Sequence, residues 1–336
     1  MIILLGASGY VGSAFYNLLQ QRGKPFLALS RKEIDYTRFD LLLELLRTKK
    51  PQFLINAAGY TGKPNVDACE VARADTLQGN TLFPQTVAHA CLAAGVPWGH
   101  VSSGCIYAGA KLVENGREWV EKDLTLPEIK AKLENPESKI EVHGFTENDA
   151  PNFSFRDGPC SFYSGTKALG EEAITHLSER AARDPLGSPN DMLPLSQSYL
   201  WRLRIPFDEF NNPRNYLTKI QSYSKVYDNV NSLSHRGDFV KACLDLWEKR
   251  APFGTYNVTN PGFVTTRQVV GMIEKILRPN RAFQYWENDA EFYRVGAATP
   301  RSNCVLDATK LLATGVKIRP VEEALEAALQ CWKPQK

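Results

Sequence analysis

The sequence lacks the cysteine pairs that build disulfide frameworks and zinc clusters. Its seven cysteines are odd in number and widely spaced, and no two of them form a CxxC arrangement. The five histidines show no spacing suited to a metal ion, so we predict no metal site. A reducing cytoplasm fits this cysteine usage best, and most of the thiols are expected to be small buried apolar groups.

Long hydrophobic runs and an excess of one charge are also missing. The first apolar run, residues 2–5, ends in Gly6 and is too short for a signal sequence or a membrane span, so we expect neither. The 40 basic and 37 acidic residues leave a net charge of +3, which is too balanced to indicate a nucleic-acid or membrane partner. Function must therefore be inferred from a site.

Strand-like apolar runs alternate with helical patterns at the start of the chain, which is typical of a parallel sheet covered by helices. Strands are predicted at 2–5, 25–30, 52–56, 98–102, 198–205 and 254–258, and helices at 11–21, from the cap Asp40 to about 50, at 72–94, 126–133, 162–180 and 265–277. Residues 108–159 show no sustained strand period, and 181–196 are predicted to form a surface loop. The fold class is α/β, a Rossmann-type doubly wound parallel sheet with a smaller C-terminal substrate-binding lobe.

Three glycines at intervals of three, Gly6, Gly9 and Gly12, stand between the first predicted strand and the first predicted helix. The first permits a tight turn, the second lets backbone approach a pyrophosphate, and the third lets the helix pack on the strand. This context predicts a dinucleotide site. Its other members are expected from the same run and from the end of the strand at 52–56, namely Ser8, Tyr10, Val11, Ala57, Ala58 and Gly59.

The strand at 25–30 is followed by basic residues, where NAD-preferring sites place a carboxylate for the ribose 2′-hydroxyl. Arg31, with Ser30, is predicted to hold a 2′-phosphate through its forked guanidinium; the alternative is that Arg31 and Lys32 lie in solvent. We therefore predict NADPH as the cofactor, with NADH as the alternative. An NADP-binding domain is assigned to 1–205, with an insertion at about 110–158, and a substrate-binding lobe to 206–336, parts of which return to the first domain.

Tyr163 and Lys167 have a YxxxK spacing at the start of a predicted helix, so both project from one face a turn apart. The ammonium favours the phenolate and so prepares the phenol for proton transfer near neutral pH. Ser103 ends a predicted core strand, where open α/β sheets bind ligands, and would hydrogen-bond a substrate carbonyl together with Tyr163. Ser102 would point to the other side of the strand. Tyr163 and Lys167 are also expected to contact the cofactor.

The chain resembles the extended short-chain dehydrogenase/reductases. Among them it looks most like the bifunctional 3,5-epimerase/4-keto-reductases that finish rhamnose synthesis on a nucleotide and, more distantly, the dTDP-4-dehydrorhamnose reductases. The resemblance is carried by residues 56–70, 103–107, 162–164, 212–215, 259–262 and 300–303. It implies NADPH-dependent reduction of a UDP- or dTDP-linked 4-keto-6-deoxyhexose. It also implies adenine contact by Asp35 and substrate contacts by Thr61, Asn65, Asn212, Arg214, Asn215 and Arg301.

The same resemblance implies that Cys105 and Lys219 are the acid/base pair of a C3/C5 epimerisation. The C4 carbonyl acidifies the protons at C3 and C5, and inversion needs a base on one face and a proton donor on the other. The alternatives are that Cys105 is an ordinary buried thiol and that Lys219 binds a diphosphate or lies in solvent. Sugar 4,6-dehydratases carry an Asp-Glu pair where this chain has Gly104 and Cys105, so dehydration is not expected.

Three other functions stay open at this point. They are a 4-keto-reductase without epimerase activity, a nucleotide-sugar 4-epimerase that recycles bound NAD, and a protein that senses NADPH without turnover. Ser103, Tyr163 and Lys167 argue against a sensor, which has no need of proton chemistry. A homodimer is usual for the family.

Overall fold

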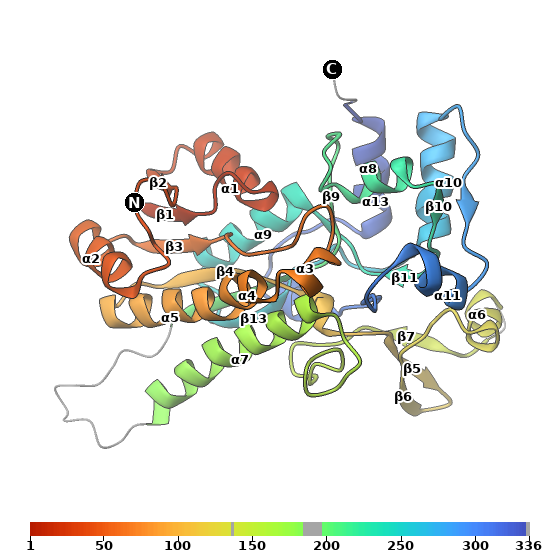
Figure 1. Cartoon of the computed structure of the whole chain (residues 1–336), viewed down its shortest axis with the longest axis horizontal. Helices are drawn as coiled ribbons and strands as arrows, with labels where there is room; N and C mark the ends of the chain where they lie inside the picture. Colours follow the sequence, from red (N-terminus) through yellow and green to blue (C-terminus); the bar gives the residue numbers. More distant parts are fainter. Residues whose placement is uncertain (136–137, 184–196, 334–336) are drawn as a thin grey trace. The chain divides into compact units, whose positions relative to one another are not determined.

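The computed structural model describes residues 1–135, 138–183 and 197–333 (Figure 1). The chain divides into two compact units. Unit 1 comprises Met1–Ser103, Ser161–Arg202 and Cys243–Tyr256. Unit 2 comprises Gly104–Cys160, Leu203–Ala242 and Asn257–Lys336. The second unit therefore includes the segment that follows Ser103 as well as most of the C-terminal part of the chain.

Unit 1 is built on a six-stranded sheet with the order β13-β8-β4-β3-β1-β2. Its strands are β1 (Ile2–Leu5), β2 (Phe26–Leu29), β3 (Phe53–Asn56), β4 (Trp98–Ser103), β8 (Ser198–Leu203) and β13 (Gly254–Asn257). Ile3 lies opposite Leu27 of β2 on one side and Leu54 of β3 on the other, both in parallel pairing. The order reverses at β1, as in doubly wound sheets, and the predicted α/β Rossmann-type sheet is confirmed.

The helices of unit 1 follow the predicted pattern, with two corrections. They are α1 (Tyr10–Gln21), α2 (Phe39–Lys49), α3 (Ala68–Val71), α4 (Arg73–Leu77), α5 (Phe83–Ala94), α7 (Phe162–Arg183) and the end of α9 (Arg236–Glu248). The single helix predicted for 72–94 is wrong, because a π-helical turn, η1 (Gln78–Leu82), interrupts it. Asp40 is not the cap of α2. Arg38 occupies the N-cap with extended backbone, and its guanidinium donates to the Asp40 carboxylate in the first helical turn.

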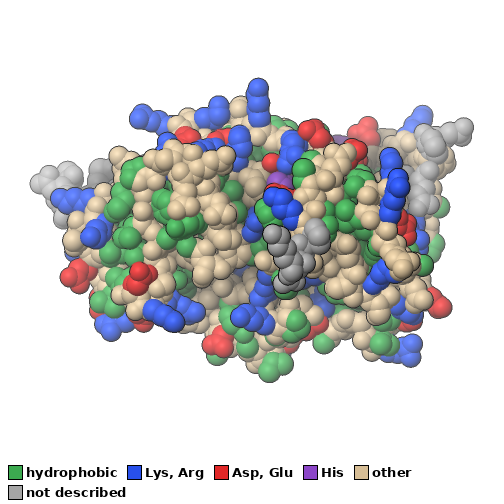
Figure 2. All heavy atoms as spheres, turned by 90° about the horizontal axis from the view of Figure 1, so that it is seen from above, with side chains coloured by type: hydrophobic (Ala, Val, Ile, Leu, Met, Phe, Trp, Pro, Cys, Tyr) green, Lys and Arg blue, Asp and Glu red, His purple; other side chains and the backbone are tan. Residues whose placement is uncertain are grey.

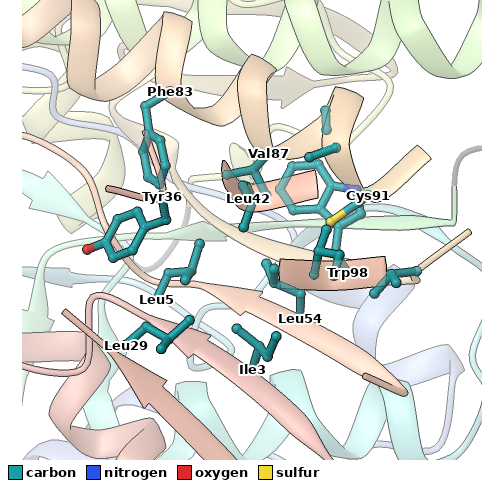
Figure 3. Close-up of a cluster of buried hydrophobic side chains, with 14 of the residues drawn as sticks. Ile3, Leu5, Leu29, Tyr36, Leu42, Leu54, Phe83, Val87, Cys91 and Trp98 are labelled. Atoms are coloured by element: carbon teal, nitrogen blue, oxygen red, sulfur yellow. The ribbon is translucent and has the colours of Figure 1, made fainter. Parts of the chain in front are cut away.

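One face of the sheet is closed by a hydrophobic core that packs against α2 and α5. Side chains of the strands, such as Ile3 and Leu54, point toward helix side chains such as Leu42 and Val87 (Figure 3). Apolar runs on β1 and β3 are buried along their whole length, as expected for parallel strands covered by helices on both faces. This packing fixes the carboxyl ends of the strands, where the candidate site lies.

Unit 2 contains a small antiparallel sheet that the sequence did not predict. β5 (Ala110–Glu114) pairs with β6 (Arg117–Glu121) and with β7 (Glu141–His143), so the expectation that 108–159 has no sustained strands is wrong. The missed signal is the pair Asn115-Gly116 between β5 and β6. Both residues have positive φ, 53° and 79°, which is the conformation of a two-residue hairpin turn. The helix predicted nearby is confirmed as α6 (Pro127–Glu134).

The rest of unit 2 packs short strands and helices around a second core. The helices are the turn η2 (Gly104–Ile106), α8 (Tyr216–Ser222), α10 (Thr266–Leu277), α11 (Asp289–Glu291), η3 (Phe292–Gly296), α12 (Thr309–Ala313) and α13 (Val321–Gln330). The strands are β9 (Pro206–Phe207), β10 (Lys225–Val226), β11 (Val230–Asn231), β12 (Ser234–His235), β14 (Val264–Thr265) and β15 (Gln284–Tyr285). Leu217, Ile273 and Leu325 join α8, α10 and α13 in this core. The predicted capped helix is α10, which Thr265 and Gln268 begin with a capping box.

The surface carries charges of both signs. On the face drawn in Figure 2, Lys and Arg side chains are interspersed with Asp, Glu and uncharged ones. Within the described ranges, no helix combines the length and the apolar composition needed to cross a membrane. Of the surface loop predicted at 181–196, residues 181–183 end α7 and the remainder lies outside the described residues.

Candidate functional site

A pocket of about 530 Å³ lies at the carboxyl ends of β1, β2 and β3 in unit 1. Because the strand order reverses at β1, this is the edge where open α/β sheets bind ligands. The pocket gathers most of the residues predicted for cofactor binding. Its walls include Gly6, Ser8, Gly9, Ser30, Arg31, Ala57, Ala58 and Gly59.

The glycine loop gives this pocket a wall of bare backbone. Gly6 has a φ of +79°, and a Cβ placed on it would lie 2.6 Å from the Ala58 backbone nitrogen. A Cβ on Gly12 would lie 1.9 Å from the Gly6 carbonyl oxygen, so only glycine lets α1 pack this closely on the loop. Tyr10, Val11 and Gly12 form the first turn of α1 and are not among the wall residues. The loop and the helix N-terminus fit a dinucleotide pyrophosphate.

The corner after β2 contains a carboxylate that sequence reasoning missed. The Ser30 N–H and hydroxyl both donate to Glu33 Oε2, each at 2.8 Å. These two bonds lower the pKa of Glu33, and the bond from the backbone N–H has the larger effect. The available signal was the Ser-x-x-Glu spacing, which is typical of reciprocal capping. Asp35, predicted to contact adenine, accepts from the Thr37 hydroxyl at 2.5 Å and is not among the wall residues, which include the neighbouring Tyr36 and Thr37.

Ser103, Tyr163 and Lys167 are all buried, each less than a tenth exposed. Ser103 is the last residue of β4, and the other two lie one helical turn apart at the start of α7. A Cβ placed on Gly59 would lie 3.5 Å from Lys167 Nζ, so the ammonium lies against the pocket wall. Burial, and then the charge of Lys167, hold the pKa of His100 well below its usual range. The structure thus brings Lys167 and the dinucleotide pocket together.

Asn80 joins the pocket wall to α7. Its Oδ1 accepts from the Tyr60 N–H at 3.0 Å, and its Nδ2 donates to the Tyr60 carbonyl at 2.9 Å and to Thr166 Oγ1 at 3.3 Å. The residue is 1% exposed, so its amide lies inside the fold and not on a helix surface. The turn η1, in which the residue lies, also supplies Gly79 to the pocket wall.

A buried ion pair that was not predicted from the sequence lies in the same region. Arg202 Nη2 donates to Glu171 Oε2 at 2.8 Å, and both side chains are less than a tenth exposed. Ser102 Oγ donates to the other Glu171 oxygen at 2.5 Å. Since Ser102 precedes Ser103 and Glu171 lies one turn beyond Lys167, these bonds connect β4, β8 and α7 next to the predicted catalytic residues.

In unit 2, Cys105 contacts a buried arginine. Arg204 Nη1 donates to Cys105 Sγ at 3.3 Å, and its Nη2 donates to the Asn231 side chain and to the Ser302 carbonyl. Arg204 is 2% exposed, and among residues 1–135, 138–183 and 197–333 no carboxylate is paired with it. The same part of the chain contains no group of three His, Cys, Asp or Glu side chains placed to hold a metal.

The other predicted residues of unit 2 divide into two groups. Burial, followed by the charges of Arg214 and Arg301, lowers the pKa of Lys219, so these three cations lie near one another. Asn215 is fully buried and is the N-cap of α8; its amide accepts from Leu217 and donates to Asp208 and Phe210, which gives it a structural role.

Three further residues predicted to bind substrate lie in loops. Asn212 Oδ1 accepts from the Arg214 N–H at 2.8 Å in unit 2. Thr61 and Asn65 belong to unit 1 and follow β3, where Asn65 Oδ1 accepts from the Asp67 N–H at 2.8 Å. Thr61 is exposed.

Comparison with known proteins agrees with this geometry. Residues 1–132 match the family described as the RmlD substrate binding domain. The bifunctional dTDP-4-dehydrorhamnose 3,5-epimerase/dTDP-4-dehydrorhamnose reductase of Arabidopsis thaliana is 29% identical over 324 residues, which cover 96% of this chain and 90% of that protein. The chain therefore resembles the extended short-chain dehydrogenase/reductases, and among them these enzymes.

Solved structures of similar proteins share the fold of this chain. The L780 UDP-rhamnose synthase from Acanthamoeba polyphaga mimivirus superimposes with a TM-score of 0.76 at 21% identity, covering 98% of both chains. The dTDP-4-dehydrorhamnose reductase of Bacillus anthracis, in complex with NADP, gives a TM-score of 0.70 at 18% identity, covering 98% of this chain and 96% of that one. The names of these relatives refer to enzymes of nucleotide-linked sugars, and the Bacillus anthracis structure contains NADP.

Proposed function

We propose that this dehydrogenase/reductase uses NADPH to reduce the 4-keto group of a UDP- or dTDP-linked 6-deoxyhexose in the synthesis of a rhamnose-like sugar. The observation that carries the proposal is the Lys167 ammonium against Gly59 in the wall of the pocket, one turn from Tyr163 on α7. A pocket for the dinucleotide and a group that stabilises a phenolate are therefore adjacent. The names of the relatives supply the substrate class.

In this reaction Ser103 and Tyr163 donate hydrogen bonds to the oxygen of the C4 carbonyl. When bound, the reduced nicotinamide supplies the hydride. Tyr163 gives its proton to the oxygen as that oxygen gains negative charge, and Lys167 stabilises the phenolate that remains. The carbonyl thereby gains one hydride at carbon and one proton at oxygen and becomes an alcohol.

The test is to add UDP- and dTDP-linked 4-keto-6-deoxyglucose separately to the protein with NADPH and follow the absorbance of the reduced nicotinamide. We expect a steady decline with at least one sugar and a nucleotide-linked 6-deoxyhexose as product. A protein that binds NADPH but consumes none with either sugar is a sensor. Conversion of the sugar without net loss of NADPH identifies a 4-epimerase, and either outcome contradicts the proposal.

A coupled C3/C5 epimerisation is the second proposed activity, and the Arg204 contact to Cys105 favours it. A guanidinium that donates to the sulfur stabilises the charge that develops when the thiol gives up its proton. Lys219, whose pKa is lowered by burial and by Arg214 and Arg301, loses its own proton more readily than an exposed lysine. Cys105 and Lys219 thus have the chemistry of a pair that removes and returns the protons at C3 and C5.

Replacing Cys105 by Ser tests the epimerase half. In deuterated water without NADPH, the wild-type protein is expected to introduce deuterium at C3 and C5 of the 4-keto sugar. Cys105→Ser should slow this exchange about a hundredfold, because a positioned acid/base group contributes on that order or more. Deuterium is measured by NMR or mass spectrometry of the recovered sugar.

The matched control is Cys331→Ser, which alters an exposed thiol and should leave exchange at the wild-type rate. Exchange that proceeds undiminished in Cys105→Ser would remove Cys105 from the mechanism. A wild-type protein that introduces no deuterium, yet still consumes NADPH, is a reductase without epimerase activity.

A further inference from the structure

The corner of the dinucleotide pocket after β2 holds an anion for which the reductase mechanism has no use. Glu33 is exposed, and one of its carboxylate oxygens accepts from both the N–H and the hydroxyl of Ser30, each at 2.8 Å. The Glu33 N–H donates back to the Ser30 carbonyl at 3.1 Å and closes the turn. Both donors of Ser30 are therefore already bound to a negative group.

We propose that Glu33 sets the choice between the two nicotinamide dinucleotides by competing with the ribose 2′-phosphate for Ser30. This inference rests on the proposed NADPH-dependent function. A 2′-phosphate brings close to two negative charges and needs hydrogen-bond donors, whereas Glu33 presents a like charge and occupies the donors. A ribose 2′-hydroxyl is a donor and is compatible with a carboxylate.

Arg31 acts in the opposite direction at the same corner. It lines the pocket, and its positive charge reaches this turn, because it contributes to the lowered pKa of Asp35 and opposes the burial that raises the pKa of Tyr36. A guanidinium attracts phosphate oxygens, so Arg31 favours NADPH while Glu33 disfavours it. With the two side chains opposed, the preference for NADPH is small, and we expect the two dinucleotides to be used with efficiencies within about tenfold of each other.

Two substitutions separate the charge of Glu33 from its hydrogen bonds. Glu33→Gln keeps an oxygen that accepts from Ser30 but removes the charge, and Glu33→Ala also releases both Ser30 donors. We expect the ratio of kcat/KM for NADPH to that for NADH to rise about fivefold in Glu33→Gln and further in Glu33→Ala. The rise should shrink as salt is added, because it is electrostatic and lies at the surface.

The matched control is Glu44→Gln. Glu44 is an exposed glutamate on α2 that is not among the pocket walls, and its replacement changes the net charge by the same amount. The NADPH-to-NADH ratio should stay at the wild-type value in this variant. An equal rise in Glu44→Gln would assign the effect to total charge and would overturn the role of Glu33.

Binding of cofactor fragments provides a readout that needs no turnover. Calorimetric titration with adenosine 2′,5′-bisphosphate and with 5′-AMP should show that the bisphosphate gains affinity relative to 5′-AMP in both Glu33 variants, and more in Glu33→Ala than in Glu33→Gln. If no 4-keto sugar is reduced but this gain appears, the reductase proposal fails and the role of Glu33 stands. If NADPH is consumed with sugar but neither ratio moves by more than about twofold, Glu33 does not set the preference. Equal gains with both probes also overturn it.

Discussion

Replacing Tyr163 by Phe should yield a protein that folds and binds the reduced dinucleotide but reduces the 4-keto sugar about a thousandfold more slowly. Tyr163 is only 8% exposed, and Phe fills the same space, so the packing of α7 is retained while the proton donor is removed. A positioned general acid contributes on the order of a hundredfold to ten thousandfold. The measurement is the rate of sugar reduction in a single turnover, together with the affinity for NADPH.

The control for this substitution is Tyr16→Phe on α1, which removes a phenol that accepts from Gln20 Nε2 at 3.2 Å and is not part of the pocket wall. Its rate should match the wild type within about twofold. A Tyr163→Phe protein that reduces sugar at a comparable rate would show that another group protonates the oxygen. Loss of dinucleotide binding in Tyr163→Phe would instead indicate a change in the pocket.

Replacing Glu171 by Ala should lower the free energy of unfolding by about 3–5 kcal/mol, the cost of breaking a buried ion pair. Arg202 would keep its charge in a site where its side chain is 5% exposed, and the Ser102 hydroxyl would lose its acceptor. Urea unfolding followed by circular dichroism measures the loss as a lower midpoint. The same variant should also reduce sugar more slowly, because Glu171 connects the strand that ends in Ser103 to the helix of Lys167.

The double variant Glu171→Met/Arg202→Met distinguishes the loss of the ion-pair attraction from the cost of leaving Arg202 as an unpaired buried charge. It contains no unpaired buried charge, so its unfolding midpoint should lie well above that of Glu171→Ala. Glu44→Ala, on the exposed side of α2, should change stability by no more than about 0.5 kcal/mol. A loss below about 1 kcal/mol in Glu171→Ala would mean that solvent reaches Arg202 and compensates for the missing partner.

Local sequence patterns predicted most of unit 1, because the apolar periodicity of a short buried strand or an amphipathic helix depends only on residues close together in the sequence. The same kind of signal was present and missed at Asn115-Gly116, where β6 is largely exposed and shows too little apolar alternation to be recognised as a strand. The π-helical turn at Gln78–Leu82 is different. It accompanies the bonds from Asn80 to Tyr60, twenty residues earlier, and no local periodicity encodes such a contact.

The candidate site divides along the same line. The glycine loop and the YxxxK pair are short-range patterns, and the structure places Gly6, Gly59 and Lys167 around one pocket. Arg204 and Cys105, in contrast, are 99 positions apart, and Glu171 and Arg202 are 31 apart, so only the folded chain reveals that they meet. The contact between Glu33 and Ser30 could have been predicted from the sequence, because their spacing is that of a capping box.

The amide of Asn80 also determines how the pocket can move. Three hydrogen bonds from one buried side chain tie the backbone of Tyr60 to Thr166, and the Thr166 hydroxyl donates in turn to the Tyr163 carbonyl at 2.9 Å. A swing of the loop at Tyr60 breaks both of its bonds to Asn80 at once, so we expect this loop to have no low-energy opening motion of its own. We therefore expect the pocket wall and the first turn of α7 to move together, on the timescale of the core and not on that of a surface loop.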